Sequence, residues 1–141
     1  MKRFLSPKGL IGLVENLLYE NLTMKNVKNS IMITSYYPRI PPQPQNDPAQ
    51  PVGARTPIWR HIRITNVKSE DGVNAGQIVG LPEMSVSDIV LSDVWISAGK
   101  GLQIANASGI RFENSQIVAK SGPPLTINKA DVTGIDPSTG K

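Results

Sequence analysis

The chain has 141 residues, enough for one domain with a hydrophobic core. Hydrophobic residues make up 39% and charged residues 18%, which is too apolar for a chain kept disordered by its charge. The absence of cysteine and the single histidine, His61, exclude disulfides, thiolate metal sites, multi-histidine metal sites and a cysteine nucleophile. No apolar stretch is long enough to span a bilayer, so we expect no membrane partner, and nothing in the sequence calls for a cofactor.

The net charge of +4 is unevenly distributed along the chain. Residues 1–68 hold ten Lys and Arg against three acids, whereas residues 69–141 hold five against eight. A basic half can attract a polyanion such as an acidic polysaccharide, although a solvated surface is the more common explanation. The basic residues are scattered singly without aromatic residues between them, so we do not expect nucleic-acid binding.

Four segments, at 17–22, 62–67, 89–94 and 110–115, share one pattern of residue types. Each reads apolar, any, apolar, polar, Asn or Asp, and then a small or apolar residue. This alternation places the apolar members on one face of a strand. A second short strand follows each segment, at 30–33, 76–79, 101–104 and 124–127, and residues 130–132 begin a partial fifth unit.

The spacing of these units predicts stacked repeats. The intervals from Asn66 to Asp93, from Asp93 to Asn114 and from Val79 to Ile104 all fall in the range of about 20–30 residues, which is typical of solenoid repeats. The interval from Asn21 to Asn66 is longer and fits one period plus an insertion at residues 38–57. That insertion holds seven of the twelve prolines, so we expect an extended, polyproline-like arm without strand pairing.

Repeats of this length with two strands each predict an all-β fold in which four to five coils stack. The leucine-rich repeat pattern is absent, and a β-sandwich would not repeat the same phase. In such a stack an Asn or Asp column forms one corner, since Asn tolerates left-handed backbone. The expected columns are Leu17/Ile62/Ile89/Ile110 and Tyr19/Ile64/Leu91/Phe112 inside, and Asn21/Asn66/Asp93/Asn114 at the corner.

Three stretches carry a family resemblance: Arg3–Ser6, Gly12–Met24 and Asn29–Tyr37. They resemble the C-terminal part of glycoside hydrolase family 28, the polygalacturonases, and residues 81–117 resemble its bacterial members. The similarity extends over about residues 3–133. It implies a right-handed parallel β-helix, with residues 1–141 as one truncated domain interrupted by the arm at 38–57.

Members of this family hydrolyse galacturonic-acid polymers of pectin with inversion, which needs an acid and a carboxylate on opposite sides of the bond. The family's Asn-Thr-Asp, Asp-Asp and Gly-His-Gly motifs are absent from this sequence, and His61 does not match the last of them. Its Arg-x-Lys motif is represented by Arg3 alone, because Leu5 replaces the lysine. We therefore expect no catalytic residues and no hydrolysis by this chain alone.

The resemblance implies two substrate-binding residues, Arg3 and Tyr37. Arg3 could pair with a uronate carboxylate, although a residue this near the terminus is more often frayed. Tyr37 matches the family tyrosine that binds the sugar, but it could instead pack at the root of the arm. Trp59 and Trp95 are further candidates for sugar stacking, and the alternation around Trp95 puts it on the outer surface, where a protein contact is the other interpretation.

The remaining acids are expected to be structural or solvated. Glu70 and Asp71 are adjacent and so point to opposite faces of an extended chain, and Asp71-Gly72 is typical of a turn. Asp88 and Asp93 bracket a strand, and Asp93 fits the corner column. No metal site is expected.

Three functions stay open from the sequence. The chain is a polygalacturonase-like protein without catalysis of its own, an oligomeric β-helix that holds acidic polysaccharide, or a glycosidase whose site assembles between subunits. We expect a homo-oligomer, dimer or trimer, formed through the open N-terminal coil and the arm. Family members acting on pectin are usually exported, but no signal peptide is visible, so the sequence does not assign a location.

Overall fold

The computed structural model describes residues 12–36, 39–54 and 56–141, and within them the protein is all-β, as expected. The strands are β1 (Leu13–Lys25), β2 (Asn29–Thr34), β3 (Ile58–Val79), β4 (Val86–Glu113) and β5 (Gln116–Thr133). A single 3-10 turn, η1 (Pro44–Asn46), is the only helical element in these residues.

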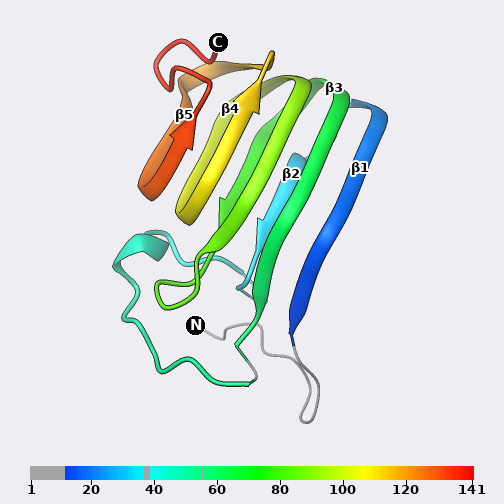
Figure 1. The fold of residues 1–141 in the computed structure, drawn as a ribbon. Coiled ribbons are helices and arrows are strands. Elements are labelled where there is room, and N and C mark those ends of the chain that lie inside the picture. Colours follow the sequence, from blue (N-terminus) through cyan, green and yellow to red (C-terminus); the bar gives the residue numbers. More distant parts are fainter. Residues whose placement is uncertain (1–11, 37–38, 55) are drawn as a thin grey trace.

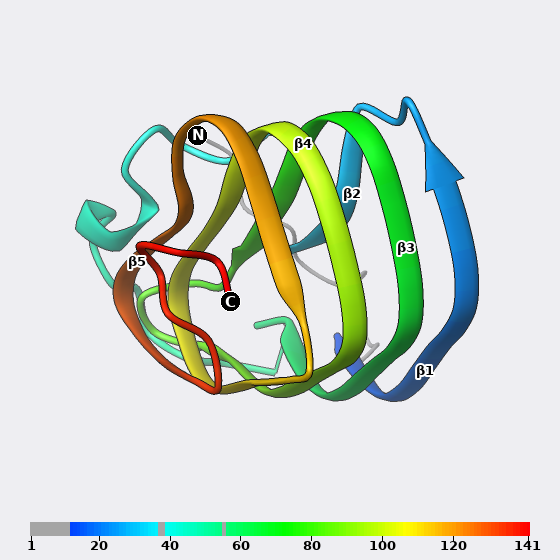
Figure 2. The same ribbon diagram turned by 90° about the horizontal axis from the view of Figure 1, so that it is seen from above.

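All four strand pairings are parallel, in the order β1-β3-β4-β5, with β2 also paired to β3. Figure 1 shows these strands side by side, and Figure 2 shows that each long strand bends around a common interior. The register joins Leu17 to Ile62, Ile62 to Ile89, and Trp95 to Gln116. Each of these intervals equals the interval between the corresponding repeats in the sequence.

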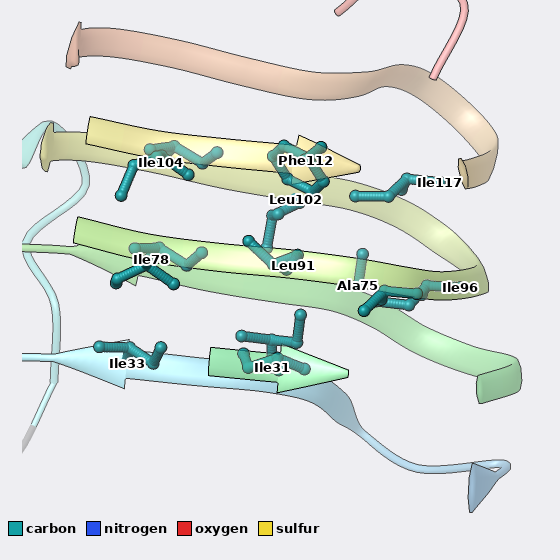
Figure 3. Packing of buried hydrophobic residues seen from close by; sticks show 14 of the residues in the cluster. Ile31, Ile33, Ala75, Ile78, Leu91, Ile96, Leu102, Ile104, Phe112 and Ile117 are labelled. Atoms are coloured by element: carbon teal, nitrogen blue, oxygen red, sulfur yellow. The ribbon is translucent and has the colours of Figure 1, made fainter. Parts of the chain in front are cut away.

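Residues that the register places beside one another in successive strands form rows, and the inward rows make the core. The register joins the first three members of each expected inward row, Leu17/Ile62/Ile89 and Tyr19/Ile64/Leu91, and the rows are buried from β3 onward. The expected last members, Ile110 and Phe112, are buried too. A further row joins Ile33, Ile78 and Ile104, which lie one above another in Figure 3. In this row every β-branched side chain packs on another like it, which suits the pleated surface of a sheet.

The sequence-based alignment of residues 76–79 with residues 101–104 was wrong by one position. Val79 was expected opposite Ile104, but the structure pairs Ile78 with Ile104 and Val79 with Ala105. Ile78 also pairs with Ile33 of β2, so the expected alignment placed residues 76–79 one position too late, which residue type alone did not reveal because Ile78 and Val79 are adjacent, apolar and both fully buried. Val79 consequently leaves the inward row and is buried with Tyr36, Leu81 and Ala105 in a second, smaller cluster.

The bends of the strands occur at residues with left-handed backbone, and in β1 and β3 these recur at every fifth position. In β1 and just after it they are Asn16, Asn21 and Asn26, with φ between 57° and 58°. The equivalent residues of later strands are His61, Asn66 and Asp71, then Asp88 and Asp93, and then Gly109 and Asn114. Asn and Asp are the side-chain-bearing residues that adopt this conformation most readily, which explains why they occupy the corners.

The expected corner column of Asn21, Asn66, Asp93 and Asn114 is confirmed, with φ between 45° and 57° throughout. Side chains link it at two of its three steps. Asn66 Nδ2 donates to Asn21 Oδ1 at 2.8 Å, and Asn114 Nδ2 donates to Asp93 Oδ1 at 2.6 Å. The column therefore combines a backbone requirement with amide hydrogen bonds between neighbouring strands.

The proline-rich arm makes no regular strand in residues 39–54, as expected, but it does not project from the protein. Asn106, which is buried in β4, donates through Nδ2 to the carbonyl oxygen of Pro44 at 3.0 Å. Lys129 Nζ in β5 donates to the carbonyl oxygen of Gln45 at 2.8 Å. The arm thus connects the region after β2 to the last strands of the same chain (Figure 2).

Replacement of Asn66 tests the corner constraint. Asn66→Ala loses both the tolerance for positive φ and the bond to Asn21, so the free energy of unfolding should fall by about 2 kcal/mol. Asn66→Gly loses the bond but keeps the backbone conformation, and it should cost less than about 1 kcal/mol. Urea unfolding followed by circular dichroism measures both values; equal losses would mean that left-handed backbone is not the dominant constraint.

Candidate functional site

The two binding residues implied by the family resemblance, Arg3 and Tyr37, lie outside the described residues. The adjacent Tyr36 is buried, and its hydroxyl donates to Asp47 Oδ2 at 2.7 Å across the root of the arm. Tyr36 therefore has a packing role in the arm, while sugar binding by Tyr37 and Arg3 stays a prediction.

Most carboxylates of the described strands are engaged with a basic or amide group nearby. Glu15 pairs with Arg60 at 2.8 Å, Glu70 pairs with Lys68 at 2.9 Å, and Asp71 lies 3.6 Å from Lys120 Nζ. Asp93 accepts a bond from Asn114, as its place in the corner column suggested. These contacts are those of surface and corner residues, and they fit the expectation that the acids are structural.

His61 occupies a corner position beside Asp88 on the next strand, which the sequence had not indicated. Its Nδ1 lies 2.6 Å from Asp88 Oδ2, and Arg63 Nη1 lies 3.3 Å from Asp88 Oδ1. The hydrogen bond from His61, with a further contribution from Arg63, lowers the pKa of the Asp88 carboxyl below its ordinary value. His61 and Arg63 of β3 thus hold Asp88 of β4 at a corner of the sheet.

The lowered pKa of Asp88 predicts a pH dependence of stability. Because the folded protein favours the ionised carboxylate, its contribution is present above about pH 4 and is lost as pH falls through the folded pKa. Asp88→Asn should therefore lower the free energy of unfolding at neutral pH but have a diminishing effect in acid. Unfolding curves of both proteins from neutral to acidic pH measure this; a constant difference would contradict the assignment.

Trp95 faces outward on β4 between the buried residues Val94 and Ile96, as its alternation predicted. The register places Lys68 beside it on β3 and Gln116 beside it on β5. Lys68 Nζ lies 5.6 Å from the centre of the Trp95 ring, within the range of a cation–π contact. We call this row, Lys68, Trp95 and Gln116, the tryptophan row.

A surface hollow of about 580 Å³ adjoins Trp95 and Gln116 of the tryptophan row and extends toward the C-terminus, away from Lys68. Polar side chains form much of its lining, with Gln116 from β5, Asn114 from the bend between β4 and β5, and Lys141 from the chain end. An indole face, two lysines and amide groups are the means by which proteins bind a sugar ring that carries a carboxylate. This is the arrangement among the described residues that best suits a polar ligand.

Trp59, the other tryptophan candidate, is not an outer platform. It is partly buried, packs against the core and lines an apolar hollow at the exposed side of β1. Its contacts with the core favour a packing role over sugar stacking.

Sequence reasoning found Trp95 but missed Lys68 and Gln116. The signal was present, because the three residues occupy the same phase of successive repeats. Extending the repeat alignment from the inward positions to the outward ones would have brought them together.

Across the described ranges no group of His, Asp and Glu is arranged to hold a metal ion. None of the helical structure in that part of the chain is long and apolar enough to cross a membrane. Comparisons with protein-family models, with curated proteins and with solved structures found no match to this chain.

Proposed function

We propose that this protein is a polygalacturonase-like, right-handed parallel β-helix that binds acidic polysaccharide such as polygalacturonate and does not cleave it alone. The β-helix is supported by the parallel register of every strand pairing and by left-handed corners at every fifth position. The pectin-related function rests on the sequence resemblance together with the surface around Trp95.

The observation that carries the binding proposal is the tryptophan row. The partly exposed indole of Trp95 offers an apolar face to the C–H groups of a sugar ring. Lys68 is 58% exposed and can turn toward a uronate carboxylate, while Gln116 and Asn114 supply amide donors and acceptors. Because the row crosses three strands, its groups are spaced along the sheet, as a linear chain of charged sugars requires.

The absence of cleavage follows from the acid groups. Inverting hydrolysis needs one protonated and one ionised carboxyl group flanking the bond. The sequence has none of the family's acid motifs, and Asp93, the carboxylate beside the hollow, accepts a hydrogen bond from Asn114. A reducing-sugar assay on polygalacturonate should therefore remain at background, and release of reducing ends by the pure chain would contradict this part of the proposal.

Substitutions in the tryptophan row test binding directly. Trp95→Ala should weaken the affinity for polygalacturonate by about tenfold or more, since it removes the stacking face. Lys68→Gln should reduce the salt dependence of binding, because one cationic contact is lost. Isothermal titration with the soluble polymer at two salt concentrations measures both effects.

Arg111→Gln provides the matched control. Arg111 is as exposed as Lys68, at 58%, and it pairs with Glu113 as Lys68 pairs with Glu70. It lies outside the tryptophan row, so its replacement should leave the affinity unchanged. An equal loss of affinity in Arg111→Gln would mean that binding is general charge attraction. A loss of affinity in Tyr37→Ala alone would mean that the site lies at the tyrosine that the family resemblance implies.

A further inference from the structure

Strand β5 bulges outward opposite one step of β4. The register pairs Lys100 of β4 with Ser121 of β5. It next pairs Leu102 with Leu125, so β5 has two residues more than β4 over this step. The same step of β4 pairs with β3 without any extra residue. Residues 122–124 therefore form a local bulge, a feature that is common beside functional sites because it changes where nearby side chains point.

Two glycines are needed for the shape of this bulge. A Cβ on Gly101 of β4 would lie 2.2 Å from the carbonyl oxygen of Pro124 and 2.3 Å from that of Pro123. Any side chain at position 101 would therefore push the bulge away from β4. Gly122 has φ of 76°, and the space where its Cβ would point is open. The close approach of the bulge and its turn are thus both built into the sequence.

A hollow of about 270 Å³ opens beside this bulge, and we call it the bulge hollow. Its polar side chains are Lys100 and Gln103 from β4, and Ser121 and Thr126 from β5. No acidic side chain of the described residues lines it. Its volume lies at the small end of the range for ligand pockets, so it suits one small group rather than a length of polymer.

Each polar side chain of the bulge hollow can donate a hydrogen bond. Lys100 is exposed, and no salt bridge among the described residues involves it. Gln77 Nε2 of β3 donates to Gln103 Oε1 at 2.6 Å, which engages the acceptor of Gln103 and leaves its Nε2 group to donate. The hydroxyl groups of Ser121 and Thr126 are two further donors. One cation and three neutral donors, with no acid among them, suit an oxyanion.

We propose that the bulge hollow binds the carboxylate of a single uronic acid unit. A carboxylate carries one negative charge, which matches the single lysine, whereas a phosphate group carries nearly two at neutral pH. The hollow is larger than a carboxylate group, so it has room for part of the sugar ring, and the exposed Pro123 gives it an apolar side. This inference goes beyond the proposed function, because none of its residues lines the hollow beside Trp95 and either site can fail alone.

A heteronuclear NMR titration with sodium galacturonate, the monosaccharide, tests the site. The backbone amide signals of Gly101 and Gly122 should shift, while the indole N–H signal of Trp95 reports on the tryptophan row in the same spectra. Shifts at Trp95 without shifts at the two glycines would overturn this inference but support the proposed function. Absence of shifts at all three would count against both.

Two further ligands separate the sugar from its charge. Galactose lacks the carboxylate and acetate lacks the ring, so each should bind at least about tenfold more weakly than galacturonate. Equal affinity for galactose would overturn the assignment of a carboxylate. Equal affinity for acetate would overturn the assignment of a uronic acid and leave a site for free carboxylates.

Gln103→Glu is the most specific variant. A carboxylate oxygen at this position still accepts the bond from Gln77, so the contact between β3 and β4 is kept. The donor is replaced by a negative charge that repels the ligand, so affinity for galacturonate should fall by about 100-fold with unchanged circular dichroism. Lys100→Gln removes the cation and should weaken binding by about tenfold. Unchanged affinity in either variant would contradict the proposal.

Lys120→Gln is the matched control. Lys120 is 65% exposed on β5 and precedes Ser121, but it does not line the bulge hollow and lies 3.6 Å from Asp71. Its replacement should leave the affinity for galacturonate unchanged. A loss as large as that of Lys100→Gln would mean that the ligand responds only to the overall charge of this surface, and the site would be refuted.

Discussion

The structure depends on one constraint, which is that each long strand must place its residues directly beside the equivalent residues of the strand before. A slip of one residue would turn every inward side chain outward, so the apolar rows fix this register, and the bends must then coincide from strand to strand. Left-handed residues at every fifth position make the bends coincide. Asn66 shows how local and long-range requirements combine, because its backbone turns the strand while its amide binds Asn21 of the neighbouring strand.

The same constraint organises the surface. An outward residue of one strand has an outward neighbour on the next, so a functional surface is built as a row rather than from one loop. Lys68, Trp95 and Gln116 are brought together in this way from three successive strands. The rows stop at the two ends of the sheet, and these ends differ: residues 134–141 bond to β5 at one end, whereas Tyr19 and Leu22 are exposed at the other.

Much of this arrangement was predictable because repetition is visible in the sequence. The inward rows, the Asn and Asp corner and the outward position of Trp95 all follow from a two-residue alternation aligned in phase. The alignment of Val79 failed because Ile78 and Val79 are adjacent, apolar and both fully buried, so residue type alone did not show which of them joins the inward row. The contact of the arm with Asn106 could not be predicted, since the arm lies outside the repeats. The contact between His61 and Asp88 was missed although the two occupy equivalent corner positions, because a histidine at such a position departs from the Asn and Asp pattern.

The separation between paired strands also affects how the chain reaches this structure. The register always joins residues that belong to different repeats, and none of the named pairings is a hairpin. Bringing two paired strands together therefore costs conformational entropy before the pairing stabilises the chain. A topology whose strand pairings are all non-local folds slowly. Its folding nucleus has to contain two neighbouring long strands, and β3 and β4, which share rows of isoleucine, are best placed to form it.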